Sequence, residues 1–166
     1  PLRRGTAGWS SSVCTAGGGD AASAAATGAT ISTAGTALGR VQEAQGDYPA
    51  AIATHRAALD LHATPDSGSA AFWDAATQLA NAHFYAGHYD TADSLNRLIL
   101  SADRRRRGAG HPAVAEDLIN LGATQFERGN YAEAEAYYRQ ALAINRAWYG
   151  EDHHAVAANL TMIGRA

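Results

Sequence analysis

Seven histidines are the residues of this 166-residue chain whose type could bind a metal or transfer protons near neutral pH. His111, His153 and His154 stand at matching positions about 42 residues apart, and His83 and His88 are five residues apart around a glycine. A metal needs ligands that converge, and the sequence contains neither an HExxH pattern nor paired cysteines. We therefore expect no metal site and no cofactor.

Four consecutive arginines, Arg104 to Arg107, could contact the phosphates of a nucleic acid. However, no aromatic residues are interleaved with them, and cations are favoured at a helix C-terminus, where the helix dipole is negative. The formal net charge of −3 provides no field for attracting nucleic acid or an anionic membrane. No apolar run reaches the roughly 18–20 residues of a membrane span. We expect neither a nucleic acid nor a membrane as partner.

Catalytic chemistry is not indicated either, because the sequence has no nucleophile elbow, phosphate-binding loop or convergent pair of carboxylates. The single cysteine, Cys14, lies in residues 1–30, a tract of Gly, Ala, Ser and Thr that we expect to be disordered or a linker. The chain begins with Pro1, which predicts a fragment or a processed product. We expect no enzymatic activity. The compartment stays open, with the cytoplasm favoured.

Internal repetition organises the rest of the chain. Residues 111–150 contain two apolar-periodic runs on either side of Gly129-Asn130-Tyr131, which predicts two amphipathic helices and a tight turn. The glycine recurs 42 residues earlier at Gly87 and 41 residues before that at Gly46. A fixed period of this size predicts stacked helix pairs. We expect an all-α, right-handed superhelix of about three helix pairs plus a terminal helix, in units of about 31–66, 67–110, 111–152 and a partial unit 153–166.

Residues at spacings of three and four mark the face with which each helix should pack on its neighbours. For the central units these residues are Phe72, Ala75, Ala76, Leu79, Ala80, His83, Tyr89, Ala92, Asn96, Ile99, Leu100, Asp103, Ala115, Leu118, Leu121, Gly122, Gln125, Tyr131, Ala134, Tyr138, Ala141, Leu142, Asn145 and Trp148. For the outer helices they are Ala34, Leu38, Val41 and Gln45, then Tyr48, Ala51, His55, Ala58, Leu59 and His62, and finally Ala157, Leu160, Ile163 and Gly164. The last helix is expected to be a cap or to be followed by further repeats.

The third unit resembles the tetratricopeptide repeat, in the residues Asn120-Leu121-Gly122, Gly129-Asn130-Tyr131, Ala134, Tyr138, Ala141 and Leu142. The period exceeds the standard 34 residues by about eight. With the Gly-x-x-His joints that begin at Gly108 and Gly150, it is similar to the kinesin-light-chain-type variant. The resemblance covers about residues 31–166. Gln42, His83 and Gln125 depart from it, because the family usually has Tyr there.

The resemblance implies a protein–protein interaction module that holds a peptide or a partner helix in its concave groove, lined by the first helix of each pair. Related proteins place groove contacts at positions that correspond to Thr36, Arg40, Glu43, Asp74, Thr77, Asn81, Phe84, Tyr85, Glu116, Ile119, Asn120, Ala123, Phe126 and Glu127. Asp74, Glu116 and Glu127 make this groove acidic, so we expect a basic or mixed peptide as partner. Phe84 and Phe126 have an alternative role as packing residues between repeats.

Two other functions stay open. Bacterial members of this variant are often fused behind a catalytic domain such as a serine/threonine kinase, so the chain could be the non-catalytic regulatory region of a larger signalling enzyme. It could also be a self-associating scaffold, whose oligomeric state the sequence leaves undetermined.

Overall fold

The computed structural model of the chain describes residues 33–62 and 70–166, and the described part contains helices and no strand. The expected linker at 1–30 lies outside these ranges. Residues 33–44 are helical and are followed by the helices α2 (Tyr48–Asp60), α3 (Ala70–Tyr85), α4 (Tyr89–Arg107), α5 (Pro112–Glu127), α6 (Tyr131–Tyr149) and α7 (His154–Arg165). The helix bounds agree with the pairs expected from the 42-residue period.

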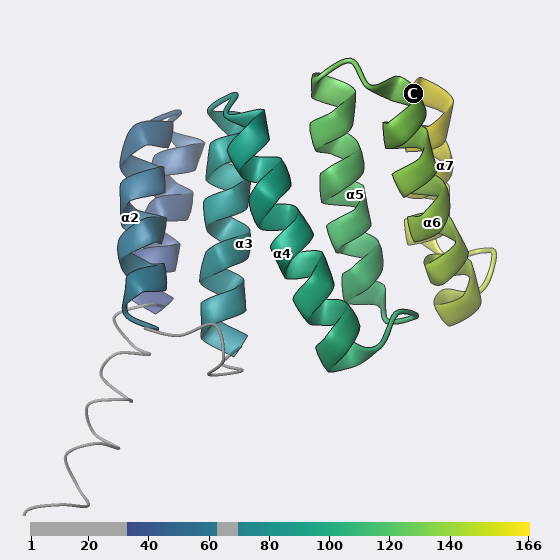
Figure 1. Cartoon of the computed structure of the whole chain (residues 1–166), viewed down its shortest axis with the longest axis horizontal. Helices are drawn as coiled ribbons and strands as arrows, with labels where there is room; N and C mark the ends of the chain where they lie inside the picture. The colour runs from purple at the N-terminus through teal and green to yellow at the C-terminus, as the bar shows by residue number, and fades with distance from the viewer. Residues whose placement is uncertain (1–32, 63–69) are drawn as a thin grey trace, which may run out of the picture.

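The helices are stacked in chain order rather than gathered around one centre. From α2 to α7, each helix packs mainly on the helix before it and the helix after it. Figure 1 shows the resulting row, which runs from the helix at 33–44 and α2 at one end to α6 and α7 at the other. Contacts limited to sequence neighbours are the property that defines a solenoid. The expected all-α repeat array is therefore confirmed.

The turn inside each pair depends on a glycine in the left-handed region. Gly87 has φ +77° and Gly129 has φ +79°, a conformation that costs glycine little because it has no Cβ. At the third turn, the Asn130 amide donates to the carbonyl of Gln125 and the Gly129 amide donates to that of Phe126, both at 2.9 Å. These bonds satisfy carbonyls that the end of α5 leaves without partners. The turn holds the two helices of the pair antiparallel.

The joints between pairs use histidine as a helix cap. The Nδ1 atom of His111 accepts a hydrogen bond from the amide of Ala113 at 3.1 Å, and Pro112 follows in the first helical turn. His153 does the same at the start of α7, where its Nδ1 accepts from the amide of Ala155 at 3.3 Å. The side chain thus satisfies one of the free amides at a helix start. The repeated Gly-x-x-His spacing is explained by this capping role.

The predicted packing faces are buried at nearly every position of the central helices. Two positions of α6 differ, because Tyr131 is 51% and Trp148 is 57% exposed. They lie near the two ends of this helix of 19 residues, where only part of the circumference has a neighbour.

Among the outer helices, the expected face of α2 is buried or half-buried, whereas the expected faces of the helix at 33–44 and of α7 were wrong. Ala34, Leu38, Val41 and Gln45 are exposed, whereas Gly39 is buried. In α7, Ala157, Leu160 and Gly164 are exposed, and the buried residues are Val156 and Asn159. Only Ile163 of that predicted face is half-buried.

Two close contacts explain why the buried faces of these two helices differ from the predicted ones. A Cβ on Gly39 would overlap the ring of His55, so only glycine allows the helix at 33–44 to lie this close to α2. In α7, Asn159 is buried because the Nδ2 atom of Asn145 donates to its Oδ1 at 2.7 Å. A count of apolar residues overlooks both a buried glycine and a buried amide.

Within the described residues, no helix combines the length and the apolar character needed to cross a membrane.

Candidate functional site

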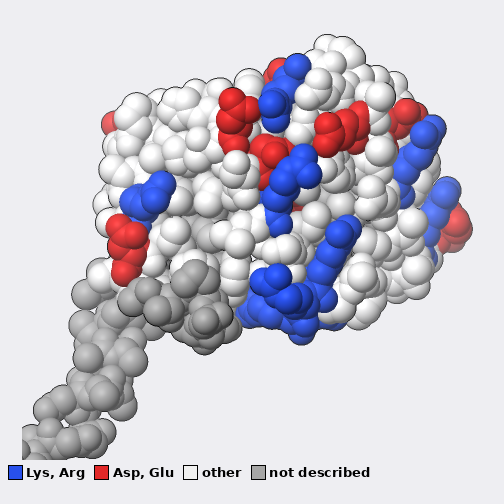
Figure 2. All heavy atoms as spheres, viewed as in Figure 1, with Lys and Arg blue, Asp and Glu red and all other residues white. Residues whose placement is uncertain are grey.

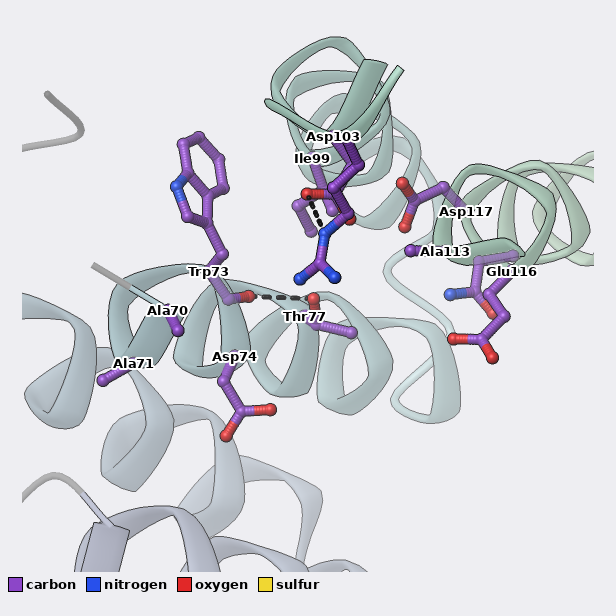
Figure 3. Close-up of a pocket in the computed structure, with 12 residues that line it drawn as sticks. Ala70, Ala71, Trp73, Asp74, Thr77, Ile99, Asp103, Ala113, Glu116 and Asp117 are labelled. Atoms are coloured by element: carbon purple, nitrogen blue, oxygen red, sulfur yellow. Dashed lines mark hydrogen bonds and ion pairs between the residues drawn. The ribbon is translucent and has the colours of Figure 1, made fainter. Parts of the chain in front are cut away.

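The predicted groove residues of α3 and α5 line three of the hollows on the molecule. The largest of these three, which we call the acidic cavity, lies between α3, α4 and α5 and has a volume of about 510 Å³ (Figure 3). Four of its lining residues were predicted from the sequence: Asp74, Thr77, Glu116 and Asn120. The sequence reasoning did not place three further charged residues here, namely Asp103 and Arg107 of α4 and Asp117 of α5.

A second hollow, the asparagine hollow, continues from the acidic cavity and shares Asn120 with it. Its volume is about 120 Å³. Its lining residues are Asn81, Phe84, Tyr85, Asn96, Asn120 and Ala123. Asn81, Phe84 and Tyr85 were predicted groove residues. The two hollows therefore form one line across the α3 and α5 side of the array.

A third hollow, the aromatic hollow, shares Ala123 with the second and has a volume of about 150 Å³. Its lining residues are Ala123, Phe126, Glu127, Tyr138, Met162 and Arg165, each 42 residues after its counterpart in the asparagine hollow. The same place in two successive repeats is thus hollow in both. Two aromatic rings line each hollow, and only the asparagine hollow has amide side chains, of which there are three. The repeated position indicates a groove that follows the array.

Four predicted residues lie elsewhere, and one of them, Thr36, is a half-buried residue of the helix at 33–44. Ile119 packs beside the core cluster of α5 and α6, so its side chain belongs to the core. Arg40 lines a separate hollow on the helix at 33–44. Glu43 lies 3.3 Å from the ring of the fully buried His55. Arg40 and Glu43 line none of the three hollows, although the charges of Glu43 and of Asp74 in α3 both act on the ring of His55.

The aromatic groove residues both line hollows and pack. Phe84 contacts Tyr85 and Tyr89 edge to face, with ring centroids 5.4 and 5.8 Å apart. Phe126 contacts Tyr131 in the same way at 5.2 Å, and the guanidinium of Arg165 lies over its ring. Their packing role and their position in the groove are therefore compatible. Tyr85 is 59% exposed, and its ring stacks on that of Tyr48 with the centroids 6.2 Å apart.

The charges of the acidic cavity are unevenly paired. Arg107 donates from Nε to Asp103 Oδ1 at 3.3 Å, and Arg106 donates from Nη1 to the same oxygen at 3.4 Å. Figure 3 shows the Asp103 bond inside the cavity, with Asp117 facing the same space from α5. Asp117 is only 7% exposed, and its buried Oδ2 atom has no hydrogen-bond partner within residues 33–62 and 70–166. One acid is therefore neutralised and the other is not.

The environment of Asp117 raises its pKa to about 7. Burial is the main cause, because it disfavours the charged carboxylate, and the neighbouring carboxylates of Asp103 and Glu116 act in the same direction. Arg107 and Arg104 oppose the shift and are outweighed. A substantial fraction of Asp117 is therefore protonated at neutral pH.

The sequence carried a signal for these missed residues. Asp103 and Asp117 lie 42 residues before Asn145 and Asn159, the hydrogen-bonded amide pair of the next joint. Comparing the repeats position by position would have identified an acid pair in place of an amide pair.

The histidines, which the sequence offered as possible metal ligands or proton carriers, have structural roles. His111 and His153 are helix caps, and the Nδ1 atoms of His83 and His88 lie 3.3 Å apart beside the turn at Gly87. Across residues 33–62 and 70–166, no group of three or more His, Cys, Asp or Glu side chains is placed to hold a metal ion.

The arginine run is in the last turn of α4, as predicted. It forms the basic patch at the lower edge of Figure 2.

Comparisons with known proteins agree with this arrangement. Tetratricopeptide repeat models match residues 36–68, 73–147 and 122–166. The repeats of a kinesin light chain-like protein from Podosopora anserina match with a TM-score of 0.74 and 18% identity, over 83% of this chain and 65% of that one. BtubC from P. vanneervenii matches with a TM-score of 0.69 and 22% identity, over 83% of this chain and 55% of that one.

A further structural match is the N-terminal domain of stress-induced protein-1 from C. elegans, with a TM-score of 0.58 and 14% identity, over 81% of this chain and 96% of that domain. No curated protein sequence matches the chain. The chain spans less than two thirds of the length of the first two structures, at 65% and 55%. At these identities the likeness shows the fold alone.

Tetratricopeptide repeats are generally protein–protein interaction modules. Because the repeat models cover most of the helical array, and its fold is that of the kinesin-light-chain-like arrays, the chain belongs to the tetratricopeptide repeat family.

Proposed function

We propose that this chain binds an extended segment of a partner protein in the groove formed by the acidic cavity, the asparagine hollow and the aromatic hollow. The observation that carries this proposal is the recurrence of one hollow at the same position in two successive repeats, linked through Ala123. A series of small sites spaced by the repeat suits an extended chain better than a compact ligand.

The groove lining supports the proposal chemically. Asn81, Asn96 and Asn120 offer amides that can pair with the backbone of a bound segment, which has both a donor and an acceptor at each residue. Tyr85 and Phe126 offer the rigid apolar area that concentrates binding energy in interfaces. The side chains thus fit a peptide whose backbone is held by amides and whose apolar residues are held by rings.

Selection from a library tests this function. Random dodecapeptides displayed on phage are selected on the immobilised full chain, and the selected peptides are measured by calorimetry. We expect Phe84→Ala and Asn120→Ala to weaken them at least tenfold, because both side chains line the groove. Leu98→Ala is the matched control, since Leu98 is a 45% exposed residue of α4 that lines none of the three hollows. Peptides that bind both groove variants as tightly as the wild type would contradict the proposal.

Charge defines the preferred partner further. Asp74 and Glu116 line the acidic cavity and Glu127 lines the aromatic hollow, so a basic or mixed segment is complementary to the groove. Replacing all three by lysine should weaken the binding of a cationic dodecapeptide. The loss of affinity should be larger at low salt, where charge repulsion is less screened. Unchanged binding would refute the preference for basic segments and leave groove binding itself standing.

Self-association is a second candidate, favoured by the exposed faces at both ends of the described array. Leu38 and Val41 are 53% and 52% exposed on the helix at 33–44, and Leu160 is 47% exposed on α7. If these faces pair between copies, sedimentation should show a dimer or larger species that Leu160→Ser shifts to monomer. If the wild-type chain sediments as a monomer over a roughly 100-fold range of protein concentration, this candidate is excluded. A regulatory role within a larger signalling enzyme stays a prediction and would use the same groove.

A further inference from the structure

We propose that the acidic cavity takes one basic side chain of the bound segment, an arginine or a lysine, and that Asp117 holds its cation. The proposal rests on the peptide-binding function above and specifies the ligand chemistry at one end of the groove. Asp117 lines the cavity and is only 7% exposed, and its Oδ2 atom has no hydrogen-bond partner among the described residues. A buried polar atom without a partner costs stability, so a ligand donor that reaches Oδ2 would relieve that cost.

The cavity has an excess of negative charge. Four carboxylates from three helices line it: Asp74 of α3, Asp103 of α4, and Glu116 and Asp117 of α5. Among the described lining residues the single cation is Arg107, which is bonded to Asp103 through Nε at 3.3 Å. Arg106 is also directed to Asp103. Both arginines thus serve one acid, and Asp117 is left for a ligand from outside.

The next joint shows that packing alone does not require an acid here. Asn159 occupies the position of Asp117, 42 residues later, and accepts a hydrogen bond from Asn145 at 2.7 Å. An uncharged side chain therefore fits the same place between helices. An acid with a desolvated charge in that place costs stability, which a ligand cation can offset.

The size of the cavity favours an organic cation. A volume of about 510 Å³ is large enough for a whole side chain and open to the groove. Asn120 lies at the boundary with the asparagine hollow, so a segment that runs along the groove can place one side chain in the cavity. Arginine is well suited, because its planar fork of donors can bond a carboxylate through two parallel bonds.

Binding should depend on pH, because the ionised Asp117 attracts a cation and the protonated form does not. The charged groups that face Asp117 are Asp103, Arg104 and Arg107 of α4, Glu116 of its own helix and Asp74 of α3. No described histidine lines the cavity. With a pKa of about 7, the ionised fraction of Asp117 rises about tenfold from pH 6 to pH 8, and affinity should rise by the same factor.

The test compares two probes on the full chain. One is an acetylated and amidated nonapeptide of Gly and Ser with a central arginine, and the other has citrulline, an uncharged residue of the same shape, at that position. The carbon-13 resonance of the Asp117 carboxyl is followed against pH with each probe. We expect the arginine peptide to lower the pKa of Asp117 and the citrulline peptide to leave it unchanged, since only a cation stabilises the ionised form.

Variants separate the local effect from overall charge. Asp117→Asn should weaken the arginine peptide about tenfold at pH 8 and abolish the pH dependence of its binding. Glu135→Gln removes the same charge from α6, where Glu135 pairs with Arg139 outside the groove, and should leave binding nearly unchanged. A pKa of Asp117 that does not respond to the arginine peptide, equal effects of both probes, or wild-type affinity in Asp117→Asn would overturn the proposal.

Failure of this inference can be told from failure of the proposed function. If library-selected dodecapeptides bind and lose affinity in Phe84→Ala but not in Asp117→Asn, the groove binds peptides and the cation site is refuted. If no dodecapeptide depends on the groove residues, both proposals fail.

Discussion

Two joints of the array have the same backbone arrangement and opposite chemistry. Between the second and third helix pairs, Asp103 faces Asp117, whose Oδ2 atom has no hydrogen-bond partner in the part of the chain that the structure describes. Between the third pair and α7, Asn145 and Asn159 stand at these positions and share a hydrogen bond of 2.7 Å, although Nδ2 of Asn159 has no partner among the described residues. The comparison shows that the repeat determines where two helices pack together, but not whether the side chains at that contact are charged or neutral. The acid pair is therefore a candidate for function.

Exchanging the chemistry of the joints gives the largest expected effect. Asn145→Asp with Asn159→Asp would place two buried acids where Tyr149 replaces the cation Arg107. We expect a loss of unfolding free energy on the order of 3–5 kcal/mol at pH 8, because the charges would be buried without a partner. Urea denaturation at pH 8 and pH 5 measures it, and stability should recover on acidification as the acids become neutral. A double variant as stable as the wild type at pH 8 would show that this joint accepts two buried acids without cost, and would contradict the contrast between the two joints.

The reverse exchange should stabilise the chain. Asp117 has a folded-state pKa of about 7 against an ordinary value of 3.8, so the folded chain binds more protons than the unfolded chain between these values. Its contribution to stability therefore falls as pH rises from about 4 to about 7 and stays low above pH 7. At roughly 1.4 kcal/mol per pKa unit, Asp117→Asn should gain up to about 4 kcal/mol at pH 8 and little at pH 4.

Urea denaturation across this pH range checks the gain. The double variant Asp103→Asn with Asp117→Asn recreates the amide pair and controls for a new clash at position 117. A pH-independent difference between Asp117→Asn and the wild type would mean that Asp117 is already ionised or already paired in the fold.

A close approach inside the pairs has an intermediate expected effect. A Cβ on Gly122 would lie 2.5 Å from Cε1 of Tyr138, whereas the second pair has Ala80 beside the smaller Asn96 at the same positions. Gly122→Ala should therefore cost about 1–3 kcal/mol of unfolding free energy through overpacking. Thermal denaturation measures the loss, with the exposed Gly164→Ala as control, because nothing lies within 4 Å of its Cβ position. Equal melting temperatures would show that α5 and α6 can separate without cost.

The outer face should matter least. Glu135 and Arg139 form an exposed pair of α6 at 2.7 Å, spaced by four residues. Such pairs contribute roughly 0.3–0.5 kcal/mol, so Glu135→Gln should lower stability by no more than that. Chemical denaturation in low and high salt checks it. A loss above 1 kcal/mol would imply that the convex face, and not the joints, determines stability.

Much of the fold followed from the sequence, because the signals that specify it are local. Gly87 and Gly129 mark the turns, and the spacing of residues such as Leu118 and Leu121 marks the buried faces. The end helices were assigned to the wrong face because their buried positions carry Gly39 and Asn159, whose burial depends on contacts with His55 and Asn145. Those contacts come from neighbouring helices, which periodicity within one helix does not describe.

The candidate site followed less completely. The repeat pattern placed Asp74, Asn81 and Glu116 on one side of the array, and they line adjoining hollows. It did not identify Asp117 as a cavity residue, since its position within the helix suggests neither burial nor a missing partner. Asp117 of α5 has no cation bonded to it, because Arg106 and Arg107 of α4 pair with Asp103 of their own helix. Competition of two acids on different helices for the same arginines can be recognised only once the side chains are placed in three dimensions.

The most direct test of groove binding is a map of the backbone amide resonances that shift when a library-selected dodecapeptide is added to the full chain. The account predicts shifts concentrated in α3 and α5, at residues around Asp74, Asn81 and Asn120, with small changes in α2 and on the outer face of α6. Shifts confined to α2, to the outer face of α6 or to the exposed end helices, with Asn81 and Asn120 unaffected, would contradict it.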